Sequence, residues 1–322
     1  MSMGKHKKRI LQLAFFAATY LAVAALIRAG TINDFSFAVI VTICINIILS
    51  SSLNMVTGFA GQFSLGHAGF MSIGAYVCAL TILRRPTPLG FLLGMLGGAL
   101  LAALVGLLVG LPTLRLRGDY LAIATLGMAE IIRVVFLNLE ITNGAAGLSF
   151  IPQLVDWNWL FAATAGTLLL IANFLNSSPG RACIAIQEDE VAAEAVGVNT
   201  LRYKVTVFSL GAFFAGIGGA LYAAYFYFIK PDLFGFSRSV DILVMVVVGG
   251  MGSLSGSVVA SVLLMVVSTA LQAYPALRMI LYSLLLVAVM LFRPQGLMGS
   301  KEVADLVFTR FRRAEKTEKQ GG

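Results

Sequence analysis

Apolar runs of membrane-spanning length recur along almost the whole chain, and they constrain its fold more than any other feature. A bilayer span needs roughly 20 mostly apolar residues, and such runs begin at Ile10 and continue with short breaks to Phe292. Hydrophobic residues occupy 59% of the 322 positions and charged residues only 12%, which is typical of polytopic α-helical membrane proteins. We therefore expect an all-α membrane protein of about ten transmembrane helices, with no water-soluble segment long enough for a catalytic domain.

The expected crossings divide the chain into an N-tail (1–9), a transmembrane domain (10–292) and a basic C-tail (293–322). In chain order they cover 10–27, 37–56, a glycine-rich span ending at 83, then 89–111, 120–137, 159–176, 205–229, 240–248, 258–271 and 276–292.

Basic residues gather at the predicted membrane flanks, as the positive-inside rule requires. With both termini in the cytoplasm, most of the 23 Lys and Arg residues fall on the cytoplasmic side, although Arg84 and Arg85 oppose this assignment locally. The distribution places the segment 178–204 in the cytoplasm. It also explains the net charge of +8 without a nucleic-acid partner.

The segment 178–204 is unusually polar for so apolar a chain. Pro179 and Gly180 break the incoming helix, 187–196 is predicted to be a short helix rich in Ala and Glu, and Gly197 provides its stop signal. A short polar helix between two spans must lie at the water interface. It is either a surface that docks into another protein or simply a solvated loop.

A glycine-rich stretch over 57–76 permits irregular backbone within the membrane region. Irregular backbone is tolerated there only where it is buried in protein or lines a water-filled cavity, and a helix that begins in a cavity suits a carboxylate. Close helix packing through small residues is the alternative, and the two are compatible. The candidate path residues are Gly58, Gly61, Gln62, Gly66, His67 and Gly69. A second glycine-rich break at 248–257 suggests an internal repeat.

Glu130 and Arg133 are ionisable residues inside a predicted span, and their spacing puts them on one helical face. Such groups usually pair and face the bundle interior, so they form either a structural pair or part of a pathway. Few other ionisable groups lie within the spans, which argues against a proton-relay pump.

Motifs for catalysis, metal binding and nucleotide binding are absent from the sequence. Cys44, Cys78 and Cys183 are scattered without metal-ligand spacing, and there is no phosphate-binding G-x-x-x-x-G-K-[ST] loop. We therefore expect a permease without catalytic residues or a metal site, not an enzyme.

Five motifs together resemble a known family. They are S-L-N-M-V-T-G-F-A-G-Q-F-S-L-G-H-A-G-F from Ser52, R-L-R-G-D-Y-L-A-I-A-T-L-G from Arg115, G-R-A-C-I-A-I-Q-E-D-E-V-A-A-E-A-V-G from Gly180, G-G-M-G-S-L-S-G from Gly249 and F-R-P-Q-G-L from Phe292. In this order they resemble the M-type permease subunits of bacterial branched-chain amino acid ABC importers, proteins of the inner (plasma) membrane.

The resemblance implies an H-type permease as heterodimer partner, two cytoplasmic ABC ATPases and a periplasmic substrate-binding protein, all working in membrane lipid. It implies that this chain binds no cofactor itself, that ATP is used by the partner subunits, and that 180–197 is a coupling helix. The residues expected to couple to an ATPase are Arg181, Glu188, Asp189, Glu190, Ala193, Glu194 and Gly197. The acidic residues would meet basic groups, while Ala192, Ala193 and Val196 would pack.

Substrate identity is less well determined by the resemblance. The implied substrates are leucine, isoleucine and valine, whereas related importers carry urea, short amides or other amino acids. A secondary transporter or channel that works without ATP is a further alternative, and a membrane-embedded enzyme ranks last because the spans hold only the Glu130–Arg133 pair.

Overall fold

The structure is a computed structural model that describes residues 18–30, 32–116, 118–272 and 296–299, together with residues 284, 287 and 291. The predicted N-tail (1–9), the start of the first crossing, Arg117 and most of 276–322 lie outside these residues. In chain order the helices are Ala18–Arg28, α2 (Asp34–Thr57), α3 (His67–Arg84), α4 (Pro88–Thr113), α5 (Asp119–Asn138), α6 (Trp157–Leu175), α7 (Ser178–Glu188), α8 (Glu190–Ala195), α9 (Thr200–Tyr225), α10 (Phe236–Gly249) and α11 (Leu254–Ala270), with 3-10 turns η1 (Glu140–Thr142), η2 (Gly144–Ala146) and η3 (Pro231–Phe234).

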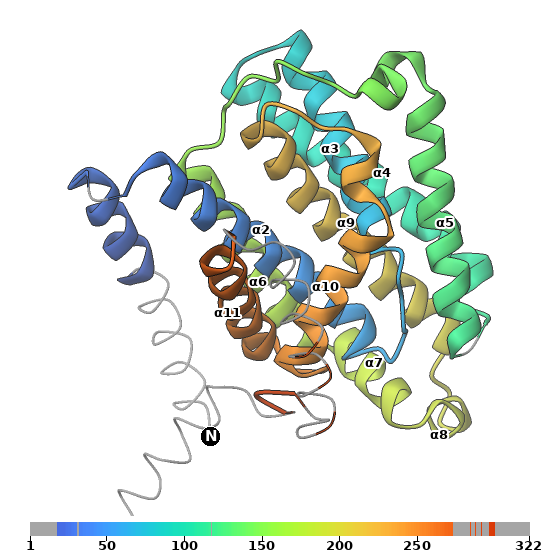
Figure 1. Ribbon diagram of the computed structural model, residues 1–322. Coiled ribbons are helices and arrows are strands. Elements are labelled where there is room, and N and C mark those ends of the chain that lie inside the picture. The colour runs from blue at the N-terminus through green and yellow to red at the C-terminus, as the bar shows by residue number, and fades with distance from the viewer. Residues whose placement is uncertain are drawn as a thin grey trace, which may run out of the picture.

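The predicted all-helical class is confirmed for the described residues, which form a helix bundle (Figure 1). Six of their helices, α2 to α6 and α9, are long and apolar enough to cross a bilayer. The short helices α10 and α11 follow each other at an angle of 120°, as a broken span or a re-entrant loop. The sequence alone predicts separate crossings for these two apolar runs, 240–248 and 258–271.

Local sequence signals explain where several of these helices begin. Thr87 caps α4 by accepting a hydrogen bond from the Gly90 N–H at 3.0 Å, and Pro88 occupies the first helical position, where its missing N–H costs nothing. Asn199 caps α9 in the same way, accepting from the Arg202 N–H at 3.1 Å.

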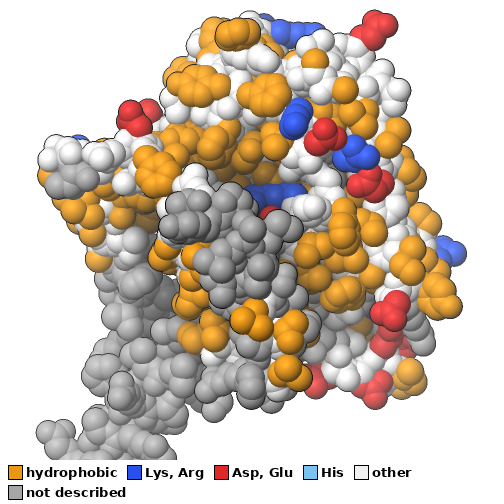
Figure 2. Space-filling view, viewed as in Figure 1, with side chains coloured by type: hydrophobic (Ala, Val, Ile, Leu, Met, Phe, Trp, Pro, Cys, Tyr) orange, Lys and Arg blue, Asp and Glu red, His pale blue; other side chains and the backbone are white. Residues whose placement is uncertain are grey.

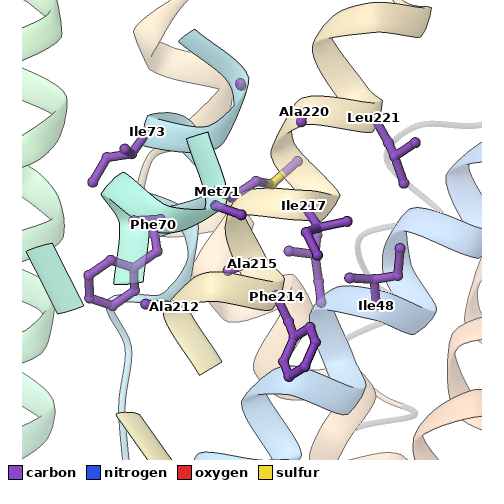
Figure 3. Packing of buried hydrophobic residues seen from close by; sticks show 14 of the residues in the cluster. Ile48, Phe70, Met71, Ile73, Ala212, Phe214, Ala215, Ile217, Ala220 and Leu221 are labelled. Atoms are coloured by element: carbon purple, nitrogen blue, oxygen red, sulfur yellow. The ribbon is translucent and has the colours of Figure 1, made fainter. Parts of the chain in front are cut away.

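Helix α9 lies at the centre of the bundle and packs against α2, α3 and α4. Figure 3 shows Met71 of α3 and Ile48 of α2 close to the small and branched residues of α9. The backbones approach so closely that a Cβ atom on Gly219 would overlap the carbonyl oxygen of Met71. Small residues thus set the helix spacing in this core, as expected where lipid provides no hydrophobic drive for association.

The two faces of helix α4 differ clearly in composition and in burial. Gly90, Gly94, Gly98, Ala102 and Gly106 are buried against α3 and α9. The other face is an exposed stripe of leucines at helical spacing: Leu89, Leu93, Leu96, Leu100, Leu104, Leu107, Leu108 and Leu111. A stripe of this kind requires an apolar solvent, which the acyl chains of a bilayer provide.

Candidate functional site

The glycine-rich stretch 57–76 is non-helical only over 58–66, between α2 and α3, and residues 67–76 are part of α3. We call 58–66 the first break. It is largely buried, and its polar groups are bonded within the protein. The Gln62 N–H donates to Val56 O at 3.0 Å, and the Gln62 side chain donates to Ala60 O at 2.9 Å. The Leu65 N–H donates to the Thr125 hydroxyl at 3.1 Å. The break therefore meets the requirement for irregular backbone at membrane depth, namely burial in protein.

Three of the candidate path residues pack α3 against its neighbouring helices. Gly66 and Gly69 allow α3 to pack closely on α5, since Cβ atoms there would lie 2.6 Å from Thr125 O and 2.9 Å from Ala129 Cα. His67 is 2% exposed, and its Nε2 lies 2.7 Å from the Ser52 hydroxyl of α2. These three residues hold helices together.

The two glycine-rich breaks lie against each other, although about 190 residues separate them in sequence. A Cβ on Gly58 would overlap the backbone nitrogen of Gly252, which has φ +85°. Asn54 joins them: its Oδ1 accepts from the Gly252 N–H at 2.9 Å, and its Nδ2 donates to Ser253 O and the Ser257 hydroxyl, both at 2.8 Å.

A line of polar residues continues this contact along the interface between α2 and α11. The Ser50 hydroxyl lies 2.8 Å from that of Ser261, and Ser261 also donates to the Asn46 carbonyl at 3.4 Å. We call this interface the polar seam; it is formed by the side chains of Ser50, Asn54, Ser257 and Ser261 and by the backbone carbonyls of Asn46 and Ser253. The sequence prediction missed it. The available signal was the spacing of four residues in both runs, which puts each set on one helical face.

Glu130 and Arg133 form the expected ion pair, with Arg133 Nε 2.7 Å from Glu130 Oε2. The structure adds a third member that the sequence did not predict. Asp232 of η3 lies 3.2 Å from Arg133 Nη1. The three side chains are 38%, 26% and 62% exposed, in the order Glu130, Arg133, Asp232. Arg133 thus clamps α5 to the chain between α9 and α10.

The polar segment 178–204 forms two helices, so the single predicted helix over 187–196 is wrong in its bounds. The break that Pro179 and Gly180 were expected to cause lies just before them, because α6 ends at Leu175 and α7 begins at Ser178. Ser177 caps α7 by accepting from the Gly180 N–H at 3.3 Å, and proline is well tolerated in a first turn. Asp189 then separates the helices and caps α8, accepting from the N–H groups of residues 191 and 192 at 2.9 and 3.0 Å.

Helix α8 is fastened to the start of the central helix α9. Glu190 Oε1 lies 2.7 Å from Lys204 Nζ, and the Thr200 hydroxyl donates to Glu194 Oε1 at 2.7 Å. The connection between the helices is a Schellman motif, with Gly197 at φ +86°. Two of the acidic residues expected to meet a partner are therefore engaged within this chain.

The exposed part of α8 is apolar and acidic. Ala193, which we expected to pack on a partner, is only 4% exposed and is buried in this chain. Val191 and Val196 are instead 68% and 81% exposed. Figure 2 shows acidic side chains gathered at the lower right, where Figure 1 places α7 and α8; exposed carboxylates in this segment include Glu188.

Helix α7 touches the first break directly. A Cβ on Gly61 would lie 3.3 Å from Cγ of Gln187. Arg181, on the exposed side, donates to the carbonyl of Asn176 at 3.0 Å, just after α6. Cys183 faces inward, and burial raises the pKa of its thiol to about 11, so it stays protonated at neutral pH. The polar segment, the first break, the second break and the seam are thus in continuous contact.

Comparison with known proteins identifies the family. Residues 35–291 match the family described as branched-chain amino acid transport system, permease component. The chain is 36% identical to the high-affinity branched-chain amino acid transport system permease protein LivM of Escherichia coli, over 89% of this chain and 75% of that protein. It is also 36% identical to LivM of Salmonella typhimurium, over 79% of this chain and 68% of the relative.

A second type of relative belongs to the same transport system. The permease protein LivH of Salmonella typhimurium is 26% identical over 80% of this chain and 92% of its own length. No solved structure matches the chain significantly. The family match over most of the chain, together with membrane-spanning helices and buried glycine-rich breaks, leads to one conclusion: this multi-pass membrane protein belongs to the branched-chain amino acid transport permease family.

Proposed function

We propose that this chain is a transmembrane permease subunit of an ATP-driven importer of branched-chain amino acids. It would pair with an H-type permease, work with two cytoplasmic ATPases that use the ATP, and receive substrate from a periplasmic binding protein. Similarity to proteins named as LivM supports the M-type role. The observation that carries the mechanism is the continuous contact from α8 through α7 to the two glycine-rich breaks.

The proposed topology lies in the bacterial inner membrane with both termini in the cytoplasm, which requires that α10 and α11 form a re-entrant loop or two crossings and not one broken span. In this orientation α7 and α8 lie at the cytoplasmic face. The clamp formed by Glu130, Arg133 and Asp232 lies toward the periplasm. Figure 1 is consistent with this arrangement, because α7 and α8 lie at the end of the bundle opposite the connection between α5 and α6.

Helix α8 would act as the coupling helix. Val191 and Val196 supply an exposed apolar surface of the kind that packs in a groove, and Glu188 supplies negative charge for basic residues on an ATPase. Since Glu190 is bonded to Lys204 and Glu194 to Thr200, a force on α8 would pass directly to α9. Contact between Gln187 and Gly61 would pass it to the first break as well.

The substrate can be identified by measuring the uptake of labelled leucine, glutamate and urea at low external concentration, in cells with and without this chain. We expect loss of leucine uptake alone. Loss of urea uptake alone would keep the importer architecture and change the substrate. Leucine uptake that persists after ATP depletion would instead indicate a secondary transporter or a channel.

Coupling is tested by Val191→Asp combined with Val196→Asp. Both side chains are exposed, so we expect the protein to assemble in the membrane while transport-coupled ATPase activity falls at least roughly tenfold, because carboxylates would replace packed apolar surface. Phe150→Asp is the matched control, since Phe150 is 92% exposed in the connection between α5 and α6. Unchanged coupling in the double variant would exclude α8 as the coupling surface.

A further inference from the structure

Two further charged residues, Arg238 and Asp241, lie in the first turns of α10 and are part of neither the clamp nor the coupling segment. Both are half-buried. Because they are three residues apart, they share one face of the helix. The Arg238 Nη2 donates to the side-chain carbonyl of Asn46 at 2.9 Å.

Arg238 reaches the middle of a neighbouring helix. Asn46 lies near the middle of the 24-residue helix α2, so the Arg238 guanidinium sits far from both ends of that helix. The neighbouring Ser239, 2% exposed, accepts from the Ala68 N–H at 3.3 Å, at the start of α3 beside the buried break. One face of the first turn of α10 therefore packs against α2 and α3. An ionisable residue at such depth is expensive to keep in a membrane and usually serves a substrate or ion path.

The polar seam and a surface groove both end at this point. Asn46 is the first residue of the seam, which it joins through its backbone carbonyl. One and two turns earlier on the same face of α2, Thr42 and Ala38 line a groove closed on its other side by Met265 and Thr269 of α11. Arg238 thus lies where a groove lined by both apolar and polar residues meets a line of hydroxyl and carboxamide groups.

We propose that Arg238 and Asp241 form a binding station for a zwitterionic aliphatic amino acid partway through the membrane. Arg238 binds the carboxylate, Asp241 binds the ammonium group, and Asn46 orients the guanidinium. A guanidinium matches a carboxylate in geometry and charge, and a carboxylate three residues away suits an α-ammonium group. The inference rests on the function proposed above and assigns the substrate's charged groups to residues of this chain.

The test is leucine transport by the complete importer in proteoliposomes, supplied with saturating leucine-loaded binding protein. We expect Arg238→Gln to lower leucine turnover roughly ten- to a hundredfold, the size of a lost charge-assisted hydrogen bond, with Arg238→Lys partly active. Asp241→Asn should lower turnover similarly, and ATP hydrolysed per leucine should rise in both. Arg84→Gln, an exposed change at the end of α3, is the control and should leave all values unchanged.

Cysteine labelling separates contact with substrate from a structural role. Arg238→Cys should react with a charged, water-soluble thiol reagent, and turnover with leucine should slow that reaction. Leu100→Cys, on the exposed leucine stripe of α4, should not react because lipid covers it. The native cysteines of the described chain are buried and give a low background.

The outcomes distinguish the two proposals. If the wild-type importer moves no leucine, the proposed function fails. If it moves leucine and Arg238→Gln is as fast as wild type, or if residue 238 is labelled no faster than residue 100, the binding station is overturned and the function stands.

Discussion

The interface between α9 and α3 and the interface between α2 and α11 solve the same problem by different means. Helices in lipid gain nothing from burying apolar surface against each other, so they associate through close backbone packing or through hydrogen bonds. At the first interface Gly219 fits against the carbonyl of Met71. At the second, the polar seam, Asn54 bonds to both Ser253 and Ser257.

The two solutions differ in how easily they can change. Glycine packing tolerates no displacement without a collision or a void, and it surrounds the buried centre of α9. Hydrogen bonds of hydroxyl and carboxamide groups can be exchanged for bonds to water or to a passing polar solute. We infer that the α3–α9 interface is the fixed part of the permease and that the polar seam is the part that opens.

The largest expected effect is at the fixed interface. Gly219→Val would place a branched side chain into the α3 backbone, and we expect loss of folded protein, a cost above about 4 kcal/mol. Yield of monodisperse protein in detergent measures this. Gly97→Val is the control, because a Cβ there meets nothing within 4 Å. A folded Gly219→Val protein would show that the α3–α9 interface is adjustable after all.

The next largest effect on stability is expected at the ion pair that joins α9 to α8. The Lys204 side chain is 6% exposed, and Lys204→Met would remove the ammonium group that lies 2.7 Å from Glu190, whose side chain is 27% exposed. Breaking a buried pair costs about 3–5 kcal/mol; because Glu190 reaches water, we expect about 2 kcal/mol. Thermal unfolding in nanodiscs measures it, and ATPase coupling should fall as well. Combining Lys204→Met with Glu190→Gln should restore part of the stability; no recovery would mean that the pair is not the cause.

Sequence patterns predict the parts of this fold whose signals are local. Apolar length located α2 to α6 and α9, and the spacing of Glu130 and Arg133 predicted their pairing. Helix bounds in the polar segment were harder. Ser177 and Asp189 are good cap residues, yet Pro179 and Gly180 signalled only a break, so α7 was missed.

Contacts between distant segments had no comparable signal. Asp232 joins Arg133 across 99 residues, and Asn54 reaches Gly252 across 198. Their partners are set by how the helices fold back on each other, which hydropathy does not specify. Ala193 shows the same limit: its small size fits docking on another protein as well as burial in this one, and the structure shows burial.

The seam itself is tested first at its most connected residue. Asn54→Ala would leave the Gly252 N–H and the Ser257 hydroxyl without Asn54 as a partner, at a cost of about 1–3 kcal/mol. If the seam opens during transport, leucine uptake should fall by more than this loss of stability explains, because the closed contact between the two breaks would be lost. Uptake per folded importer, compared with thermal stability, separates the two effects. A fall in stability with normal uptake would assign Asn54 to the fixed part.

The smallest effect on stability is expected where the polar seam is formed by two hydroxyl groups. Ser50→Ala combined with Ser261→Ala removes both partners of one 2.8 Å hydrogen bond, and replacing both by small apolar groups is nearly neutral for stability, within about 0.5 kcal/mol. The polar lining would nevertheless be interrupted one turn from Asn46, so the turnover of a zwitterion should fall several-fold while thermal stability stays the same. Equal turnover in the double variant and the wild type would mean that no solute exchanges bonds with these hydroxyls. The polar seam would then be, like the α3–α9 interface, a fixed contact.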